Sequence, residues 1–97
     1  MKKITKNAAN AFVANANFSS ANTKVIANGA IVGLYLHGNL IAEKDITTNE
    51  TKITNAEWQT NTTKERLNGL PNVSISQKAG VWYLNGQQWD GEWIIIK

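Results

Sequence analysis

The sequence predicts one α+β domain over residues 1–97, with an N-terminal helix and one short capped helix packed on a mostly antiparallel sheet of β-hairpins. Apolar residues near the N-terminus recur at the three- and four-residue spacing of a helix. Alternating apolar and polar residues follow, interrupted by Asn-Gly and Gly-Asn pairs that are typical of tight hairpins. A chain of 97 residues leaves little room for a second core.

The composition limits the class of protein. A hydrophobic fraction of 42% with 18% charged residues is ordinary for a folded domain and argues against intrinsic disorder. The absence of cysteine argues against a disulfide-rich secreted protein and suits a reducing cytoplasm. No apolar run approaches the roughly 20 residues that span a bilayer, and no apolar segment follows the N-terminal lysines as in a signal peptide. We therefore expect a soluble protein with no membrane partner.

The first expected element is a helix over residues 6–16. Ile4 and Thr5 match a hydrophobic staple followed by an N-cap. The apolar face is narrow and rich in alanine, which favours close packing against a sheet; it consists of Ala8, Ala9, Phe12, Val13 and Ala16. Residues 17–22 are expected to form a loop.

A series of hairpins is expected next. The strands are 23–28, 30–36, 40–42 and 51–55. Asn28-Gly29 predicts a two-residue turn, because both central residues of a type I′ turn need positive φ. A second reversal at Gly38-Asn39 would place Leu36 opposite Ile41.

A short capped helix is expected after Trp58. Thr62-Thr63-Lys64-Glu65 matches a capping box, in which the first hydroxyl accepts from the Glu65 amide and the carboxylate reaches back. Asn68-Gly69 would supply a left-handed residue that ends the helix. About two turns are too few for stability in isolation, so the helix requires packing by the leucines near its end.

The C-terminal part is expected to be a Trp-rich β-meander. Asn85-Gly86 predicts a two-residue turn that sets Trp82 opposite Trp89. The chain would then turn at Asp90-Gly91 into a last strand. An isolated edge at Ile94–Ile96 would invite a second chain, so a homodimer through a sheet edge is one expected assembly.

A basic and polar cluster at the start of the second helix is the leading candidate for a binding site. Lys64 and Arg66 stand beside Asn61 and Thr63, and a helix N-terminus offers free amides and a positive dipole. Hydroxyls, amides and basic side chains together suit a phosphate backbone. The net charge is +3, and the N-terminal lysines would extend the surface (Lys2, Lys3 and Lys6). The alternative is a solvated helix face on which threonine only caps the helix.

Three tryptophans are candidates for a partner-binding surface, namely Trp58, Trp89 and Trp93. Exposed aromatic rings stack on bases or form part of apolar patches that bind proteins. The alternative is a place in the core, because a small sheet needs the bulk of such side chains.

No catalytic, metal or cofactor site is expected. His37 is the only histidine, and without cysteine or a neighbouring carboxylate it cannot complete a zinc site of three or four ligands. Asp90 and Glu92 could face the same way, as glycosidase acids do, but a domain this small implies no cleft. The glycines form no phosphate-binding loop. The sequence therefore favours binding over enzymatic activity.

Several long segments occur in a fixed order along the chain: Tyr35–Ala42, Trp58 with Thr60–Pro71, Val73–Ile75 with Gln77-Lys78, and Trp82–Gly86 with Trp89–Gly91. Together they resemble a family of small uncharacterised phage-encoded proteins that is common among phages of gut bacteria. The resemblance covers nearly the whole chain. It departs most in the N-terminal helix, which is richer in Ala and Asn than the family pattern leads us to expect, and again at Glu57, where we expect Gly.

The resemblance implies a phage origin and a place in the cytoplasm of the bacterial host, with the virion as the alternative. It transfers no catalytic residue. Small phage products of this kind act mostly by binding, so we expect an accessory protein that binds nucleic acid. The alternative is a binder of a host or virion protein, either an inhibitor of a host enzyme or defence system or a capsid accessory protein.

Overall fold

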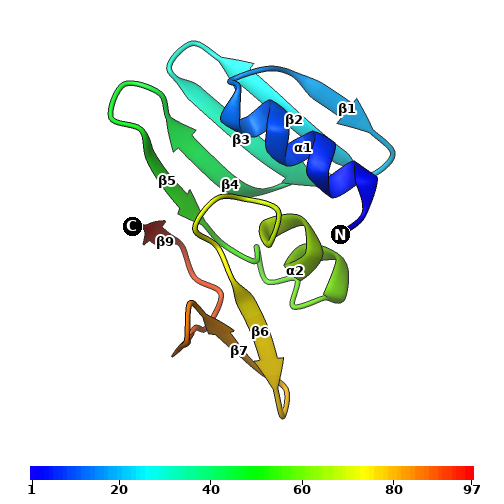
Figure 1. Cartoon of the computed structure of the whole chain (residues 1–97), viewed down its shortest axis with the longest axis vertical. Coiled ribbons are helices and arrows are strands. Elements are labelled where there is room, and N and C mark those ends of the chain that lie inside the picture. Colours follow the sequence, from blue (N-terminus) through cyan, green and yellow to red (C-terminus); the bar gives the residue numbers. More distant parts are fainter.

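Two helices and two antiparallel sheets make up the structure, a computed structural model that describes all of residues 1–97. The predicted α+β class is confirmed (Figure 1). In chain order the elements are α1 (Lys3–Val13), β1 (Phe18–Ser20), β2 (Thr23–Asn28), β3 (Ile31–Leu36), β4 (Asn39–Asp45), β5 (Glu50–Ile53), α2 (Asn61–Leu67), β6 (Ile75–Lys78), β7 (Val81–Leu84), β8 (Gln87–Gln88) and β9 (Ile94–Ile96). Neither helix is long and apolar enough to cross a membrane.

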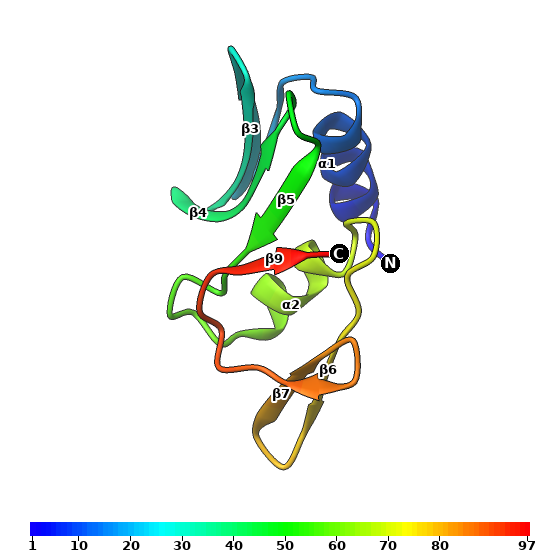
Figure 2. The same ribbon diagram turned by 90° about the vertical axis from the view of Figure 1, so that its left-hand side faces the viewer.

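The larger sheet has six strands in the order β1-β2-β3-β4-β5-β9. Its first strand, β1, lies in the segment expected as a loop, where Phe18 pairs with Val25. Helix α1 lies across one face of the sheet, and no helix covers the other face (Figures 1 and 2). Phe12 of α1 shares the core with alternate strand residues such as Val25 and Leu34, all of which are almost fully buried.

Lys44 fixes the C-terminal end of α1 against the sheet. Its Nζ donates to the carbonyl oxygens of Phe12 at 2.7 Å and Val13 at 3.2 Å. These are among the last carbonyls of the helix, which have no partner inside the helix, so a cation there also complements the helix dipole. Burial lowers the pKa of the Lys44 ammonium below its ordinary value.

The smaller sheet, β6-β7-β8, projects beyond α2 (Figure 2). The predicted Asn85-Gly86 turn is confirmed, with φ of 50° and 87°. The rings of Trp82 and Trp89 lie with centroids 6.1 Å apart, as expected from that turn. The prediction of a continuous C-terminal meander is wrong, however, because β9 leaves this sheet and pairs with β5 of the larger one. There Ile94 lies opposite Ile53, so the apolar run extends the main sheet.

Two predicted turns are displaced by one residue. Residues Gly29 and Ala30 connect β2 to β3, since Asn28 pairs with Ile31. The second turn is His37-Gly38, with φ of 51° and 80°, and it places Leu36 opposite Asn39 instead of Ile41. An irregularity between Leu34 and Tyr35 changes the register by one residue, so that Leu34 lies opposite Ala42. The left-handed pair therefore comes one position earlier than the Gly-Asn pattern indicates.

The helix ends also differ from prediction. Helix α1 begins at Lys3, so Thr5 is a buried residue inside it and does not cap it. Thr60 caps α2 by accepting from the Thr63 amide at 3.2 Å, which replaces the expected box beginning at Thr62. Gly69 is not left-handed; a Cβ there would lie 2.6 Å from Cγ2 of Thr5, so glycine permits the close approach of the helices.

Candidate functional site

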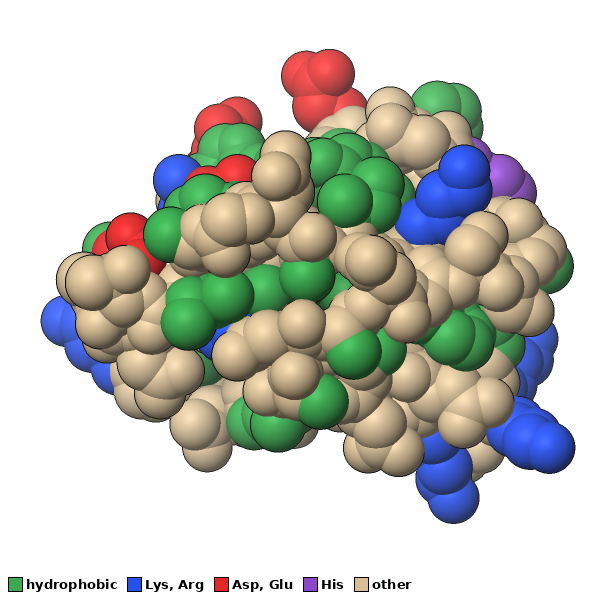
Figure 3. Space-filling model, turned by 90° about the horizontal axis from the view of Figure 1, so that it is seen from above, with side chains coloured by type: hydrophobic (Ala, Val, Ile, Leu, Met, Phe, Trp, Pro, Cys, Tyr) green, Lys and Arg blue, Asp and Glu red, His purple; other side chains and the backbone are tan.

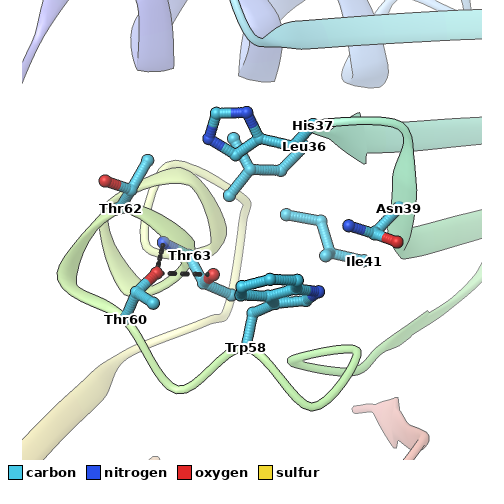
Figure 4. A pocket seen from close by; sticks show the side chains of 8 residues that line it. All are labelled: Leu36, His37, Asn39, Ile41, Trp58, Thr60, Thr62 and Thr63. Carbon is cyan, nitrogen blue, oxygen red and sulfur yellow. Dashed lines mark hydrogen bonds between the residues drawn. The ribbon is translucent and has the colours of Figure 1, made fainter.

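A pocket of about 230 Å³ lies between the β3–β4 turn and the segment that leads into α2. We call it the Trp58 pocket. From the hairpin come Leu36, His37, Asn39 and Ile41 (Figure 4). Trp58 and three threonines of the 60–63 segment form the other side. The two halves are distant in sequence, so the fold alone brings them together.

The backbone before Trp58 is strained. Ala56 and Glu57 have φ of 52° and 67°, and Trp58 closes the turn by donating its amide to the Asn55 carbonyl at 2.8 Å. Left-handed conformation costs a residue other than glycine about 1–2 kcal/mol. The Asn55 side chain supports the turn by accepting from the Glu57 amide at 2.8 Å. Such strain persists where the surroundings fix it, and it is often found at functional sites.

The turn holds Trp58 at the surface, where its side chain is 57% exposed. Across the pocket lies the imidazole of His37, another left-handed residue, whose amide donates to the Asn22 carbonyl at 2.8 Å. Figure 4 shows the two aromatic rings on opposite sides of the pocket, with Leu36 and Ile41 between them. The pocket therefore has two aromatic walls and an apolar interior.

A second, more polar hollow of about 290 Å³ adjoins the pocket at Thr62, which lines both. We call it the basic hollow. Its other lining residues are Lys2, Asn61, Lys64, Glu65 and Asn68. The ammonium of Lys64 donates to Oε1 of Gln77 at 3.1 Å, which directs it along the outer side of α2.

The carboxylate of Glu65 is engaged in this hollow. It accepts from the Lys2 amide at 3.0 Å. Burial by itself would raise the pKa of Glu65, but hydrogen bonds from the Lys2 amide and the Thr5 hydroxyl, with the positive N-terminus and Arg66, lower it below its ordinary value. The negative charge of Glu65 on α2 thus interacts with the beginning of α1.

Arg66, a predicted phosphate contact, lies inside the protein at 5% exposure. Its guanidinium donates to the hydroxyls of Thr23 and Thr5, both at 2.9 Å, and to Oδ1 of Asn22 at 3.5 Å. Thr63 is fully buried, with its hydroxyl 3.0 Å from that of Thr60. The prediction that Arg66 contacts phosphate is therefore wrong, because its side chain lies on the inward side of α2 and lines neither the pocket nor the hollow. Thr63 is also buried, but it lines the floor side of the Trp58 pocket and is not a phosphate contact at the surface.

The other predicted basic residues stay at the surface. Lys2, Lys3 and Lys6 are exposed at the beginning of the chain, and Asn61 is exposed on α2. In Figure 3, basic side chains project at the right-hand end, where no acidic side chain is visible, whereas the left and upper parts of the face carry acidic side chains together with further basic ones. The visible charge is thus unevenly distributed.

The three candidate tryptophans separate into two groups. Trp58 and Trp93 are exposed, Trp93 at 44% with Nζ of Lys52 at 5.4 Å from its ring centroid. Trp89 is 7% exposed, and its indole nitrogen donates to the Glu92 carbonyl at 2.9 Å. Trp89 is therefore a core residue, and its expected place on a partner surface is corrected.

Sequence reasoning missed the hairpin half of the site. The sequence predicts no ligand contact at His37, Asn39 or Ile41. No local pattern identifies them, because their role depends on the approach of residues 58–63. The structure contains no group of three or more His, Asp or Glu side chains that could hold a metal ion.

The chain matches the family described as Kyanoviridae Gp96 protein over residues 1–95. No curated protein and no solved structure matches it. The family match confirms the phage origin that the resemblance implied, whereas the association with gut bacteria stays a prediction. Because the match includes almost every residue, the chain belongs to the Kyanoviridae Gp96 family, a family of phage proteins.

Proposed function

We propose that this phage protein binds single-stranded nucleic acid in the cytoplasm of its bacterial host. One base stacks in the Trp58 pocket, and neighbouring phosphates lie over the basic hollow. The observation that carries the proposal is an exposed indole facing an imidazole across a pocket of about 230 Å³, beside a hollow lined by lysines.

A flat ring is the ligand that suits the pocket. Trp58 offers an aromatic face on one side, with His37 across the pocket from it, and stacking on such a face contributes about 1–3 kcal/mol per base. The apolar interior favours a ring over a charged group. At the rim, the Asn39 amide supplies a donor and an acceptor for the edge of a base.

The phosphate path follows the outer side of α2. A strand that leaves the pocket past Thr62 reaches Lys64 and then Lys2 in the basic hollow. Lys3 and Lys6 continue the positive surface along α1. The acidic flank has the opposite effect, because Glu57, Asp90 and Glu92 line a separate hollow beyond Trp58 and repel phosphate there.

A second candidate function is the binding of a host or virion protein, and a different observation favours it. Trp93, Ile94 and Ile95 are consecutive and exposed at 44%, 40% and 48%. Contiguous apolar exposure is typical of protein interaction sites. This surface does not include the Trp58 pocket, so substitutions distinguish the two functions.

Fluorescence anisotropy with labelled single-stranded DNA and RNA at low salt tests the proposal. Trp58→Ala should weaken binding by about 5- to 140-fold, the equivalent of one lost stacking interaction. Trp93→Ala, an equal truncation of an exposed indole outside the pocket, is the matched control and should bind as the wild type does.

Either of two results would overturn the proposal. One is an absence of binding at tens of micromolar protein. The other is binding that survives Trp58→Ala and is lost in Trp93→Ala, which would transfer recognition to the second surface.

A further inference from the structure

Strand β9 is an unprotected edge of the larger sheet. It pairs only with β5, and it consists of three isoleucines in succession. Ile94 and Ile95 are 40% and 48% exposed. Natural edge strands are normally protected by a charge, a proline or a bulge, because free main-chain groups attract another strand. None of these devices occurs within Ile94–Ile96.

The main-chain direction in β9 follows from the contacts of β5. The Thr54 amide donates to Ile41 of β4 at 2.9 Å, and the Asn55 amide donates on the opposite side to Gly91 at 3.0 Å. Main-chain N–H and C=O groups alternate in direction along a strand, so those of Thr51 and Ile53 point toward β9, as the Asn55 amide does. Their partners in β9 are Ile96 and Ile94, whose own N–H and C=O groups therefore point toward β5. Ile95 lies between these partners, so its N–H and C=O point outward from the sheet.

We propose that β9 pairs with β9 of a second copy of this chain, antiparallel and about a two-fold axis at Ile95. The two copies then exchange main-chain hydrogen bonds at Ile95, and Ile94 of each lies opposite Ile96 of the other. The contact uses the same residues on both sides, as a two-fold interface requires. It is independent of nucleic-acid binding at the Trp58 pocket.

Side-chain chemistry selects this register. It sets Trp93 of each copy opposite Lys97 of the other, and a lysine over this indole already occurs within the chain, where Lys52 lies 5.4 Å from the ring centroid. A register centred on Ile94 would place Glu92 against Ile96. One centred on Ile96 would place Lys97 against Ile95. Both alternatives oppose a charge to isoleucine, and the register centred on Ile95 does not.

The expected dimer is weak, because the paired segment is short and a small interface gives modest affinity. Sedimentation velocity over a series of protein concentrations tests for it. The wild type should pass from monomer to dimer as concentration rises. Ile95→Pro removes the outward amide but leaves the bonds to β5, since proline is tolerated at a solvent-facing edge.

Loss of the main-chain bonds at the axis should weaken the dimer at least about tenfold in Ile95→Pro. Ile95→Val keeps the amide and the branched side chain, so it is the matched control and should dimerise. Ile95→Lys gives a second test that does not alter the backbone, because it places two like charges opposite each other at the axis. Circular dichroism establishes that each variant is folded.

Hydrogen exchange gives a direct readout in the wild type. Protection of the Ile95 amide should increase with protein concentration, whereas protection of Ile94, which bonds within the sheet, should not. A protein that stays monomeric at its highest soluble concentration would overturn the inference. So would a dimer that persists in folded Ile95→Pro and Ile95→Lys, because it would use another surface.

Discussion

The two faces of α2 show how one short polar segment is divided between folding and recognition. On the inward face, Thr63 and Arg66 are buried and bonded within the protein, and Thr63 also lines the Trp58 pocket from beneath. On the outward face, Thr62 and Lys64 border the pocket and the hollow. All four are polar, so their chemistry does not separate them. Their positions along the helix separate them, because Thr63 and Arg66 lie three or four residues before the buried leucines Leu67 and Leu70 and so share their face.

Arg66 is a structural residue of an uncommon kind. Its hydrogen-bond acceptors are neutral oxygens on three parts of the fold: Thr5 on α1, Thr23 on β2 and Asn22 before it. Burying a charge is costly unless it is paired and hydrogen-bonded, and Arg66 has hydrogen bonds on Nε and Nη1 to neutral hydroxyls in place of an ion pair. The guanidinium thereby connects both helices to the sheet.

Of the substitutions on the two faces of α2, Arg66→Ala is expected to have the largest effect on stability. The substitution leaves the buried hydroxyls of Thr5 and Thr23 without their donors and removes a packed side chain, so it should lower the free energy of unfolding by about 3 kcal/mol. Lys64→Ala, two residues earlier on the outward face, should change it by less than about 0.5 kcal/mol. Chemical denaturation measures both. Equal stability of the two variants would contradict the division of α2.

The next largest effect on stability is expected at Gly69, where α1 and α2 come into close contact. In Gly69→Ala the new Cβ meets Cγ2 of Thr5, which cannot turn away easily because its hydroxyl is bonded to Arg66. We expect a loss of about 1–3 kcal/mol in the free energy of unfolding. Thr5→Ser deletes Cγ2 and keeps the hydroxyl, so the substitution at Gly69 should cost much less in that background. An equal cost in both backgrounds would disprove the steric explanation.

Substitution of Lys64 on the outward face of α2 should change nucleic-acid binding without changing stability. If Lys64 contacts phosphate, Lys64→Ala should reduce the slope of log affinity against log salt concentration by about 1. Lys24→Ala removes an exposed lysine that lines neither the pocket nor the basic hollow, and it should leave the slope unchanged. Anisotropy titrations at several salt concentrations give both slopes. A reduced slope in the Lys24 variant would place the phosphate path elsewhere.

The smallest expected effect concerns Glu65. Its pKa is lowered in the folded protein, so it stabilises the fold above the ordinary value of 4.5, and this contribution is lost as the pH falls through the lower folded pKa. Glu65→Gln should therefore be slightly less stable than the wild type at neutral pH and equal to it in acid. Denaturation midpoints from pH 7 to about pH 3 test this. If the difference in stability between Glu65→Gln and the wild type grew in acid, the Glu65 carboxylate would not stabilise the fold as described.

The sequence predicted those features of the fold that depend on residues close together in the chain. The α+β class and the Asn85-Gly86 turn follow from alternation and left-handed residue pairs in the sequence. The position of β9 could not be predicted in this way, because Ile94–Ile96 fits either sheet and its pairing with β5 depends on distant residues. For the same reason, the sequence showed Trp58 as a candidate but not the histidine opposite it.

The inward position of Arg66 is visible in the helical spacing of the sequence. Arg66 lies three residues after Thr63 and immediately before Leu67, so the helical pattern already placed it on the inward side. Composition alone predicts that Arg66 is exposed, because arginine is mostly found at protein surfaces. In this segment, periodicity assigns the role of a polar side chain better than charge does.

The most direct test of the account is an NMR titration of the isotope-labelled protein with a single-stranded oligonucleotide. The four tryptophan indoles and the Arg66 Nε–H act as separate reporters of the pocket, the core, the β9 edge and the inward face of α2. The account predicts shifts for the Trp58 indole and for the amides of Thr62 and Lys64, with Trp82, Trp93 and Arg66 Nε–H unchanged. Shifts at Trp93 and the β9 amides with a silent Trp58 would contradict it.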